Sequence, residues 1–335
     1  MRKAYRTFIM AILTGASLLS LTACGSKAKP SNLTPVKLNE VAHSIFYAPQ
    51  YAAIELGYFK DEGIDLTLVN GAGADKVMTA LISGDADIGF MGSEASIYTY
   101  ANGSQDYAVN FAQLTQRAGN FLVGRSEQPD FKWTDLKEKK VLGGRAGGMP
   151  EMVFEYILKK NGINPSTDLT IDQSINFGLT AAAFTSNDSD YTVEFEPFAT
   201  GLEKEGKGFV VASLGVDSGY IPYTAYSVKK SYLDKNPETI QKFTNAIQKG
   251  LEYVNSHSSE EIAKVIQPQF KETDVKTIAS IVDRYKAQDT WKKDTVFNKD
   301  SFELLENILE EAGQLKDRVP YEKLVTTEFS EKAAK

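Results

Sequence analysis

The sequence predicts an α/β protein of two lobes, each with a mixed, mostly parallel sheet, followed by a helical C-terminal segment. From residue 36 onward, short runs rich in β-branched and apolar residues alternate with helical patterns, as in βαβ units. The 335-residue chain is also longer than one hydrophobic core usually serves. Beyond residue 228 the pattern is helical only, so these helices are expected to pack on a lobe already built.

The first lobe begins with three short strands, each followed by a helix. Glycines stand where helices stop or the chain turns back, at Gly57, Gly63, Gly84 and Gly103, and Ser93 is a plausible N-cap. The strands are expected at 36–41, 65–69 and 87–91, and the helices at 49–56, 75–83 and 93–100.

Two longer β-type runs, 108–115 and 121–124, precede a polar stretch rich in lysine and glutamate. We expect the first crossing between lobes there. The first lobe then comprises 36–124 and 223–335, and the second lobe comprises 125–222. Further strands are expected at 141–144, 169–173, 191–195, 209–212 and 223–228, and helices at 151–160, 179–184, 197–205, 237–255, 259–266, 273–285 and 299–315.

The N-terminal residues predict export. Arg2, Lys3 and Arg6 precede an apolar stretch that ends in Leu-Thr-Ala-Cys, which resembles a bacterial lipobox after a signal peptide of residues 1–23. Cys24 is therefore expected to carry lipid, with 24–35 as a flexible tether and the body facing outside the cell membrane. An ordinary signal that leaves a free thiol is the alternative.

Composition excludes several classes of function. The chain carries a net charge of −7, so it is poorly suited to nucleic acid. It has a single cysteine and two histidines, and it lacks a nucleophile elbow and any metal-ligand spacing. We expect no enzyme activity, no cofactor and no metal.

The stretches "YAPQYAAIELGYFKDEGIDLTLVNG" and "ALISGDADIGFMG" resemble the N-terminal lobe of substrate-binding proteins of ABC importers for sulfonates, taurine, nitrate and thiamine precursors. The resemblance implies a type II periplasmic-binding-protein fold, a small-molecule ligand, permease and ATPase partners, and a monomer. Within that family, His43 followed by Tyr47 resembles the thiamine-pyrimidine binders. The run 194–197 with Gly206 resembles their second-lobe acidic segment.

One departure from that group bears on the ligand. Its members usually carry a tryptophan and Pro-Asn just ahead of the histidine, where this chain has Leu-Asn-Glu-Val-Ala at 38–42. If the tryptophan is a stacking platform, then Phe46 or Tyr47 takes that role here, or the ligand is different. Both rings are expected in a loop, where ligand contact explains them better than core packing.

The ligand of an open α/β sheet lies beyond the carboxyl ends of the strands, so segments 43–47, 91–94, 116–120, 145–149 and 191–196 are expected to line one cleft. For His43 a structural role is the alternative, and for Gly147 and Gly148 a simple turn. The expected ligand-binding residues are His43, Phe46, Tyr47, Ser93, Glu94, Gln116, Arg145, Gly147, Gly148, Met149, Tyr191, Glu194 and Glu196.

Two features of these segments favour different ligands. The glycines of "GGRAGGMPEM" and the helix start at Pro150 favour a phosphate, sulfonate or carbonyl oxygen. A carboxylate at Glu194 or Glu196, of which one is expected to face the cleft, would accept hydrogen bonds from an aminopyrimidine and repel a sulfonate. Helix-start chemistry is the alternative for Glu196. We favour a thiamine pyrimidine precursor, with an alkanesulfonate or taurine as runner-up and a pyrimidine-precursor enzyme or an adhesin behind them.

Overall fold

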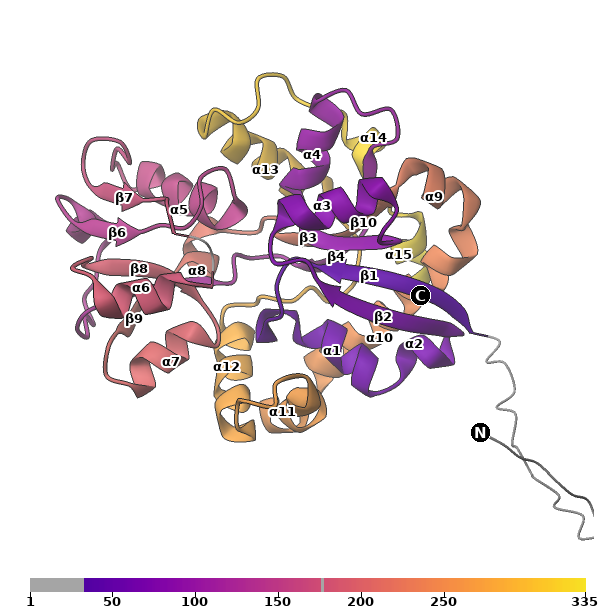
Figure 1. The fold of residues 1–335 in the computed structure, drawn as a ribbon, viewed down its shortest axis with the longest axis horizontal. Coiled ribbons are helices and arrows are strands. Elements are labelled where there is room, and N and C mark those ends of the chain that lie inside the picture. Colours follow the sequence, from indigo (N-terminus) through magenta and orange to yellow (C-terminus); the bar gives the residue numbers. More distant parts are fainter. Residues whose placement is uncertain (1–32, 176–177) are drawn as a thin grey trace, which may run out of the picture. The chain divides into compact units, whose positions relative to one another are not determined.

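The computed structural model describes residues 33–175 and 178–335; the predicted signal, Cys24 and most of the predicted tether lie outside them. Two five-stranded sheets form the framework (Figure 1), which confirms the α/β class. The first has the order β2-β1-β3-β10-β4. Its strands are β1 (Thr34–Glu40), β2 (Ile64–Asn70), β3 (Ile88–Gly92), β4 (Ala108–Thr115) and β10 (Thr224–Lys229).

The second sheet repeats this arrangement, in the order β7-β6-β8-β5-β9. In each sheet three consecutive strands pair in parallel, and one strand is antiparallel to both of its neighbours, namely β10 in the first sheet and β5 in the second. Each antiparallel strand directly follows a crossing from the other sheet. The strands are β5 (Asn120–Gly124), β6 (Lys140–Leu142), β7 (Thr170–Asp172), β8 (Tyr191–Phe195) and β9 (Phe209–Ser213).

Two expected boundaries differ from the structure. β1 begins at Thr34, so positions 34 and 35 belong to the folded body rather than to the tether. β5, which we expected in the first lobe, lies in the second sheet between β8 and β9. The first crossing is therefore 116–119, ahead of the polar lysine-rich stretch, because an apolar strand pattern does not reveal which sheet the strand joins.

Helices cover both faces of the first sheet, with α3 and α4 on one side and α1, α2 and α10 on the other (Figure 1). None of the helices within the described residues has the length and apolar character needed to cross a membrane. The helical segments are η1 (Ile45–Tyr47), α1 (Ala48–Glu55), α2 (Tyr58–Asp61), α3 (Ala74–Ser83), α4 (Glu94–Ala101), η2 (Trp133–Leu136), α5 (Met149–Lys160), α6 (Thr180–Ser186), α7 (Phe198–Lys204), α8 (Leu214–Ser218), α9 (Lys230–Lys235), α10 (Pro237–Ser256), α11 (Ser259–Ile266), η3 (Gln267–Gln269), α12 (Val275–Ala287), α13 (Lys299–Glu311), α14 (Tyr321–Leu324) and α15 (Glu328–Ala333).

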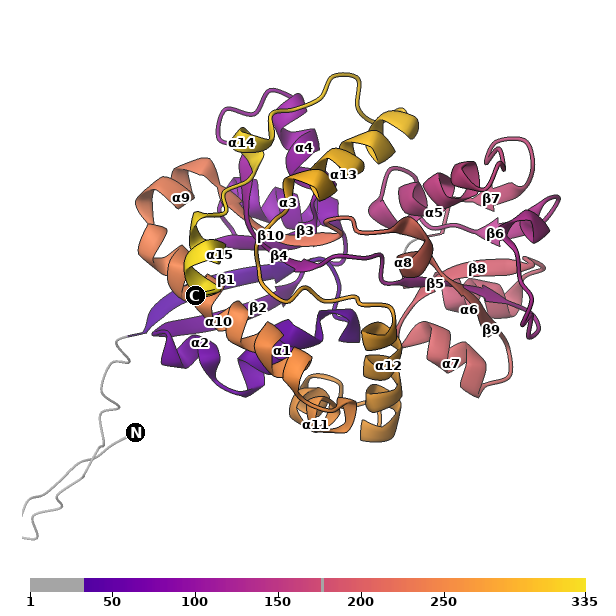
Figure 2. The same cartoon turned by 180° about the vertical axis from the view of Figure 1, so that it is seen from behind.

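The chain between α12 and α13 extends the first sheet at its edge. The Lys292 amide donates to the Leu114 carbonyl (3.2 Å), and the Gln113 amide donates to the Thr295 carbonyl (2.9 Å). Seen from behind (Figure 2), this segment runs past β4 toward α13. It therefore covers backbone groups that an edge strand would otherwise leave open to pairing with another chain.

The long helix α10 packs against α1 through a glycine. A Cβ atom on Gly250 would lie 2.2 Å from the Pro49 carbonyl oxygen and 3.0 Å from the Ala53 methyl. The two helices approach this closely because neither places a larger side chain at the contact. Residue 250 is thus one position where glycine is required by close approach rather than by its backbone angle.

We predict that Gly250→Ala lowers the free energy of unfolding by about 1–3 kcal/mol, because the new methyl group forces α10 away from α1. The matched control is Gly201→Ala in α7, where a Cβ would meet no atom within 4 Å. The free energy of unfolding of that variant should rise by about 0.5–1 kcal/mol, because alanine is a better helix former than glycine. Urea unfolding of both variants measures the difference, and equal stabilities would contradict the packing described.

Candidate functional site at the junction of the two sheets

Four of the buried polar atoms that lack hydrogen-bond partners belong to residues where the lobes meet. They are Oε2 of Glu94, the hydroxyl of Tyr223 and both amide atoms of Asn120. Glu94 begins α4 in the first lobe, Asn120 opens β5 in the second, and Tyr223 ends the second crossing. A buried polar group without a partner costs roughly 1–3 kcal/mol, so this group of atoms marks a place where a ligand can supply the missing hydrogen bonds.

The Glu94 carboxylate folds back over the end of β3. A Cβ on Gly92 would lie 2.1 Å from Glu94 Oε2, so only glycine leaves room for the carboxylate there. Burial raises the pKa of Glu94 to about 7, and the Arg145 guanidinium and the Met149 backbone amide lower it in part. Glu94 of the first lobe is thus influenced by two residues at the start of α5 in the second.

Tyr98, one turn along α4 from Glu94, joins the same two elements. Its hydroxyl donates to the Gly147 carbonyl (3.4 Å) and lies 3.5 Å from Met152 Sδ. Burial raises the pKa of Tyr98 well above its usual range, with the nearby Glu94 and Glu151 carboxylates adding to the effect. Tyr98 therefore connects the wall that carries Glu94 to the second lobe.

Aromatic rings from both lobes form the other side of the junction. Asn120 lies directly opposite Phe195 in the antiparallel β5–β8 pair, so the two side chains share a face. The Phe195 ring packs against Phe46 (centroids 5.6 Å apart) and Tyr223 (6.2 Å). The unpartnered Asn120 amide consequently stands beside an aromatic wall. Burial raises the pKa of Tyr223, and the nearby Tyr47 hydroxyl and Glu94 carboxylate add to the effect.

The expectation that Phe46 and Tyr47 lie in a loop is wrong. Ile45–Tyr47 form the 3-10 helix η1, and all three side chains are buried. The Phe46 ring fills the space beside Gly119 in the first crossing, where a Cβ would lie 2.5 Å from it. Tyr47 packs edge-on against Phe90 (4.5 Å). The two rings are core and hinge residues, and only the Tyr47 hydroxyl, which faces Thr224, points toward the junction.

His43 and Glu196 have the structural roles that were their alternatives. The His43 ring lies 2.8 Å from Glu40 Oε1 and 2.9 Å from the Gln269 carbonyl, so both nitrogens already face acceptors. Glu196 pairs with Arg284 (2.6 Å) and accepts the Thr200 amide at the start of α7 (2.9 Å). Both ring nitrogens of His43 and both carboxylate oxygens of Glu196 therefore already have partners within the protein.

The glycine-rich segment also differs from the expected anion site. The Gly147 amide donates to Glu151 Oε2 (3.0 Å), and the Gly148 amide donates to the Arg145 carbonyl (3.3 Å). Burial, together with neighbouring Glu155, raises the pKa of Glu151 to about 8. The donors at the start of α5 therefore face carboxylates of the protein itself, and Gly147, with φ 72°, serves a turn.

The remaining expected residues are dispersed. The Ser93 hydroxyl donates to the Pro222 carbonyl (2.6 Å) instead of capping α4. Glu194 accepts the Thr192 hydroxyl (2.6 Å), and burial raises its pKa to about 7. Tyr191 bonds Gln128 (2.9 Å) at the far end of β8, about 13 Å from the crossing. Gln116 lines a separate pocket beside the hinge.

Sequence reasoning included Asn120 in a cleft segment but missed Tyr98 and Tyr223. Tyr223 was interpreted as the first residue of a strand, yet β10 starts one residue later. Tyr98 follows Glu94 at the four-residue spacing that places two side chains on one helical face. That spacing is the signal that could have identified Tyr98 once Glu94 was singled out.

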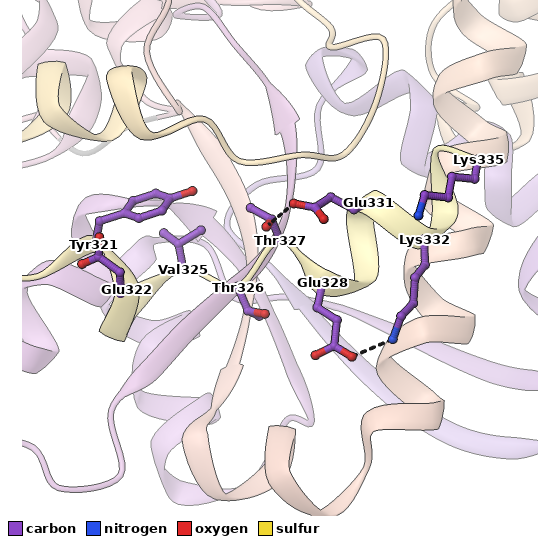
Figure 3. A pocket seen from close by; sticks show the side chains of 9 residues that line it. All are labelled: Tyr321, Glu322, Val325, Thr326, Thr327, Glu328, Glu331, Lys332 and Lys335. Carbon is purple, nitrogen blue, oxygen red and sulfur yellow. Dashed lines mark hydrogen bonds and ion pairs between the residues drawn. The ribbon is translucent and has the colours of Figure 1, made fainter.

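A separate pocket of about 490 Å³ is formed by the C-terminal helices α14 and α15 (Figure 3). Some of its charged side chains have partners in the lining: Lys332 bonds Glu328 (2.6 Å), and Glu331 accepts the Thr327 hydroxyl (2.6 Å). None of the described buried polar atoms that lack a partner belongs to this lining, so it offers a ligand fewer unsatisfied groups than the junction does. Within 33–175 and 178–335, no group of three or more His, Cys, Asp or Glu side chains is arranged to hold a metal.

The arrangement of two sheets with two crossings is that of the periplasmic binding proteins. A solved structure similar to this chain is the ligand-binding component of an ABC-type import system from Staphylococcus aureus, with a TM-score of 0.72 and 16% identity over 90% of this chain and 99% of that one. At 16% identity, this similarity shows that the two proteins share a fold.

Sequence comparison then gives the family. The model described as "NMT1/THI5 like" matches residues 45–261, and the chain belongs to that family. "Putative binding protein YtlA" of Bacillus subtilis is 45% identical over 94% of this chain and 93% of its own. The Saccharomyces cerevisiae 4-amino-5-hydroxymethyl-2-methylpyrimidine phosphate synthase THI11 is 27% identical over 62% of this chain, which spans 63% of that enzyme's length.

The pKa of Glu94 makes stability depend on pH. Its folded pKa of about 7 exceeds its ordinary 4.5, so the folded state holds the proton more tightly and stability falls as pH rises from 4.5 to 7. Glu94→Gln should therefore exceed the wild type in free energy of unfolding by about 1–3 kcal/mol at pH 8, with no gain at pH 4.5. Urea unfolding between pH 4.5 and pH 8 measures this difference in free energy. The control Glu205→Gln should have the same pH dependence as the wild type.

His43 also makes stability fall as pH rises, but through the loss of a favourable charge pair rather than the burial of a charge. The hydrogen bond to Glu40 raises its pKa above 6.5, so its stabilising contribution is complete below that pH and is lost as pH rises through the folded-state pKa. His43→Leu should lose most stability relative to the wild type in acid, and the gap should narrow in alkali. Urea unfolding at acid and alkaline pH measures this gap. An equal loss of unfolding free energy at the two pH values would show that the His43 ring does not change charge between them.

Proposed function

We propose that the protein is an extracytoplasmic solute-binding protein of an ABC importer, without enzyme activity, that captures a small solute between its lobes. The family membership, the binding-protein fold and the resemblance of its N-terminal lobe to importer components support this role. The observation that carries it is the set of partnerless buried polar atoms at Glu94, Asn120 and Tyr223.

The chemistry of these atoms favours a ligand with N–H donors. Glu94 Oε2 is a free acceptor, and the Asn120 amide offers an acceptor and two donors side by side. A 4-aminopyrimidine presents such an edge, since its amino group donates while the adjacent ring nitrogen accepts. The Phe195 and Tyr223 rings supply the apolar contact that a flat heterocycle needs. A thiamine pyrimidine precursor is therefore our proposed ligand.

A sulfonate fits this site less well. The donors at the start of α5 that would bind an anion face Glu151 and Glu94. A sulfonate placed there would find the Gly147 amide already bonded to Glu151 and the Met149 amide directed at Glu94, so it would lose the free amides that make a helix start an anion site. The alkanesulfonate alternative loses the one feature of the sequence that favoured it.

Binding of 4-amino-5-hydroxymethyl-2-methylpyrimidine, with taurine as the comparison, tests the proposal. At a hundred times its dissociation constant, a true ligand stabilises the folded state by about 2.7 kcal/mol, which a thermal-shift assay detects. We expect stabilisation by the pyrimidine and none by taurine. Stabilisation by taurine alone would contradict the proposed ligand.

Substitutions then locate the site. Glu94→Gln and Asn120→Leu should each weaken pyrimidine binding about tenfold or more, because each removes a hydrogen bond to a buried ligand. Tyr47→Phe should have a smaller effect, since that ring is core. The control Glu205→Gln changes an exposed acid and should bind as the wild type does. Full affinity in both Glu94→Gln and Asn120→Leu would place the ligand elsewhere.

A further inference from the structure

A second pocket, of about 760 Å³, lies beside the hinge (Figure 2 shows this side of the molecule). Its lining includes Gln113 at the end of β4, Gln116 of the first crossing, Tyr220 of the second, Lys292, and the first residues of α13. None of the unpartnered atoms at Glu94, Asn120 or Tyr223 belongs to it. This hinge pocket is therefore distinct from the group of atoms at the lobe junction.

The hinge pocket contains the buried side chain of Lys292, whose ammonium forms no hydrogen bond with any residue that the structure describes. Lys292 is 5% exposed, and its nearest carboxylate oxygen, Asp294 Oδ1, is 4.0 Å away. Burial lowers the pKa of its ammonium. Buried lysine side chains are rare unless an anion accompanies them.

An unpartnered acceptor stands in the same lining. Gln113 is 1% exposed, and its Nε2 donates to the Thr115 carbonyl (3.0 Å) while its Oε1 has no partner. Asp300 adds a second acceptor to the lining. An anion that also carries a hydrogen-bond donor would satisfy both groups together, balancing the charge of Lys292 and bonding the free oxygen of Gln113.

The start of α13 adds free donors. Asn298 occupies the N-cap but its side chain makes no capping bond, so the first amides of this 13-residue helix remain open to a ligand, with the helix dipole favouring negative charge. Lys299 at the first position lines the pocket as well. These donors stand on the wall formed by the first turn of the helix.

We propose that the hinge pocket binds a small hydroxyl-bearing oxyanion, of which hydrogen phosphate is the simplest, between the Lys292 ammonium and the Gln113 side-chain oxygen. The anion oxygens accept from Lys292 and the α13 amides, and its O–H donates to Gln113. Sulfate at neutral pH has no proton to donate, so the site prefers phosphate.

An occupant of this pocket would also affect the two crossings that form the hinge. The Ile221 amide of the second crossing donates to the Gln116 carbonyl of the first (3.0 Å). The Tyr220 hydroxyl and the Gln116 amide group both bond Asp289 (2.7 and 3.2 Å). Because Gln116 and Tyr220 line the same pocket, an anion bound there lies beside both crossings and is expected to favour one arrangement of them, whatever solute the lobes hold.

The test is a titration of the purified protein, free of other ligand, with inorganic phosphate and with sulfate at constant ionic strength. Thermal midpoints and the fluorescence of Trp291, the residue beside Lys292, report binding. The wild type should be stabilised more by phosphate than by sulfate. Lys292→Met should weaken phosphate binding about tenfold or more, while Lys293→Met, its exposed neighbour, should not.

Gln113→Leu examines the donor requirement separately. It should reduce the preference for phosphate over sulfate while leaving the Lys292-dependent anion effect in place. Equal phosphate affinity in Lys292→Met and Lys293→Met would overturn the proposal, as would a wild type that responds to neither anion beyond a sodium chloride control. Both lysine variants are first shown to unfold cooperatively, so that a folding defect is not taken for lost binding.

Discussion

A buried carboxylate with one free oxygen is the constraint on which the junction depends. Taking Glu94 out of water costs free energy that only hydrogen bonds or a positive charge can offset. The protein supplies part of this through Met149 and Arg145 from the opposite lobe, and it leaves Oε2 without a partner. Gly92 provides the space that this placement requires. A ligand that donates a hydrogen bond to Oε2 removes the remaining cost of burying this carboxylate. Because Glu94 also contacts the opposite lobe, it links binding of a ligand to contact between the lobes.

The lobes also meet through a second set of contacts, on the side of α7 and α12. Arg284 pairs with Glu196 (2.6 Å) and Glu203 (2.7 Å), and the Ser44 hydroxyl donates to the Glu196 carbonyl (2.9 Å). The Tyr285 hydroxyl bonds the Gly119 carbonyl (3.0 Å) within the first crossing. These contacts fix the crossings while leaving the Glu94 and Asn120 side unsatisfied, which separates the residues that hold the hinge from those that meet a ligand.

Local pattern predicted the elements well where periodicity was strong. The strands expected at 108–115 and 191–195 and the helix at 259–266 have those bounds in the structure. The pattern could not assign β5 to its sheet, because pairing partners are set by long-range contacts that no short window contains. Likewise, Phe46 and Tyr47 follow no helical or strand period in the sequence, and their burial depends on rings contributed by Phe195, Tyr223, Tyr285 and Phe90.

The candidate site was predictable only in part, for the same reason. Glu94 was identified from its place after a buried strand, and the structure brings it to the lobe junction. His43 and Glu196 share the residue types of binding groups, but Glu40, Gln269, Arg284 and the Thr200 amide occupy their polar atoms. These partners lie up to 226 positions away, so residue type alone did not separate a ligand contact from a structural bond.

Calorimetry of pyrimidine binding near pH 7, in two buffers that differ in ionisation enthalpy, examines the role of Glu94 most directly. Donation of a ligand N–H to Glu94 favours its ionised form, so the wild type should release a proton on binding in this range, and Glu94→Gln should release less. Identical proton release from the two proteins would show that the ligand does not meet Glu94, and the account of the junction would be wrong.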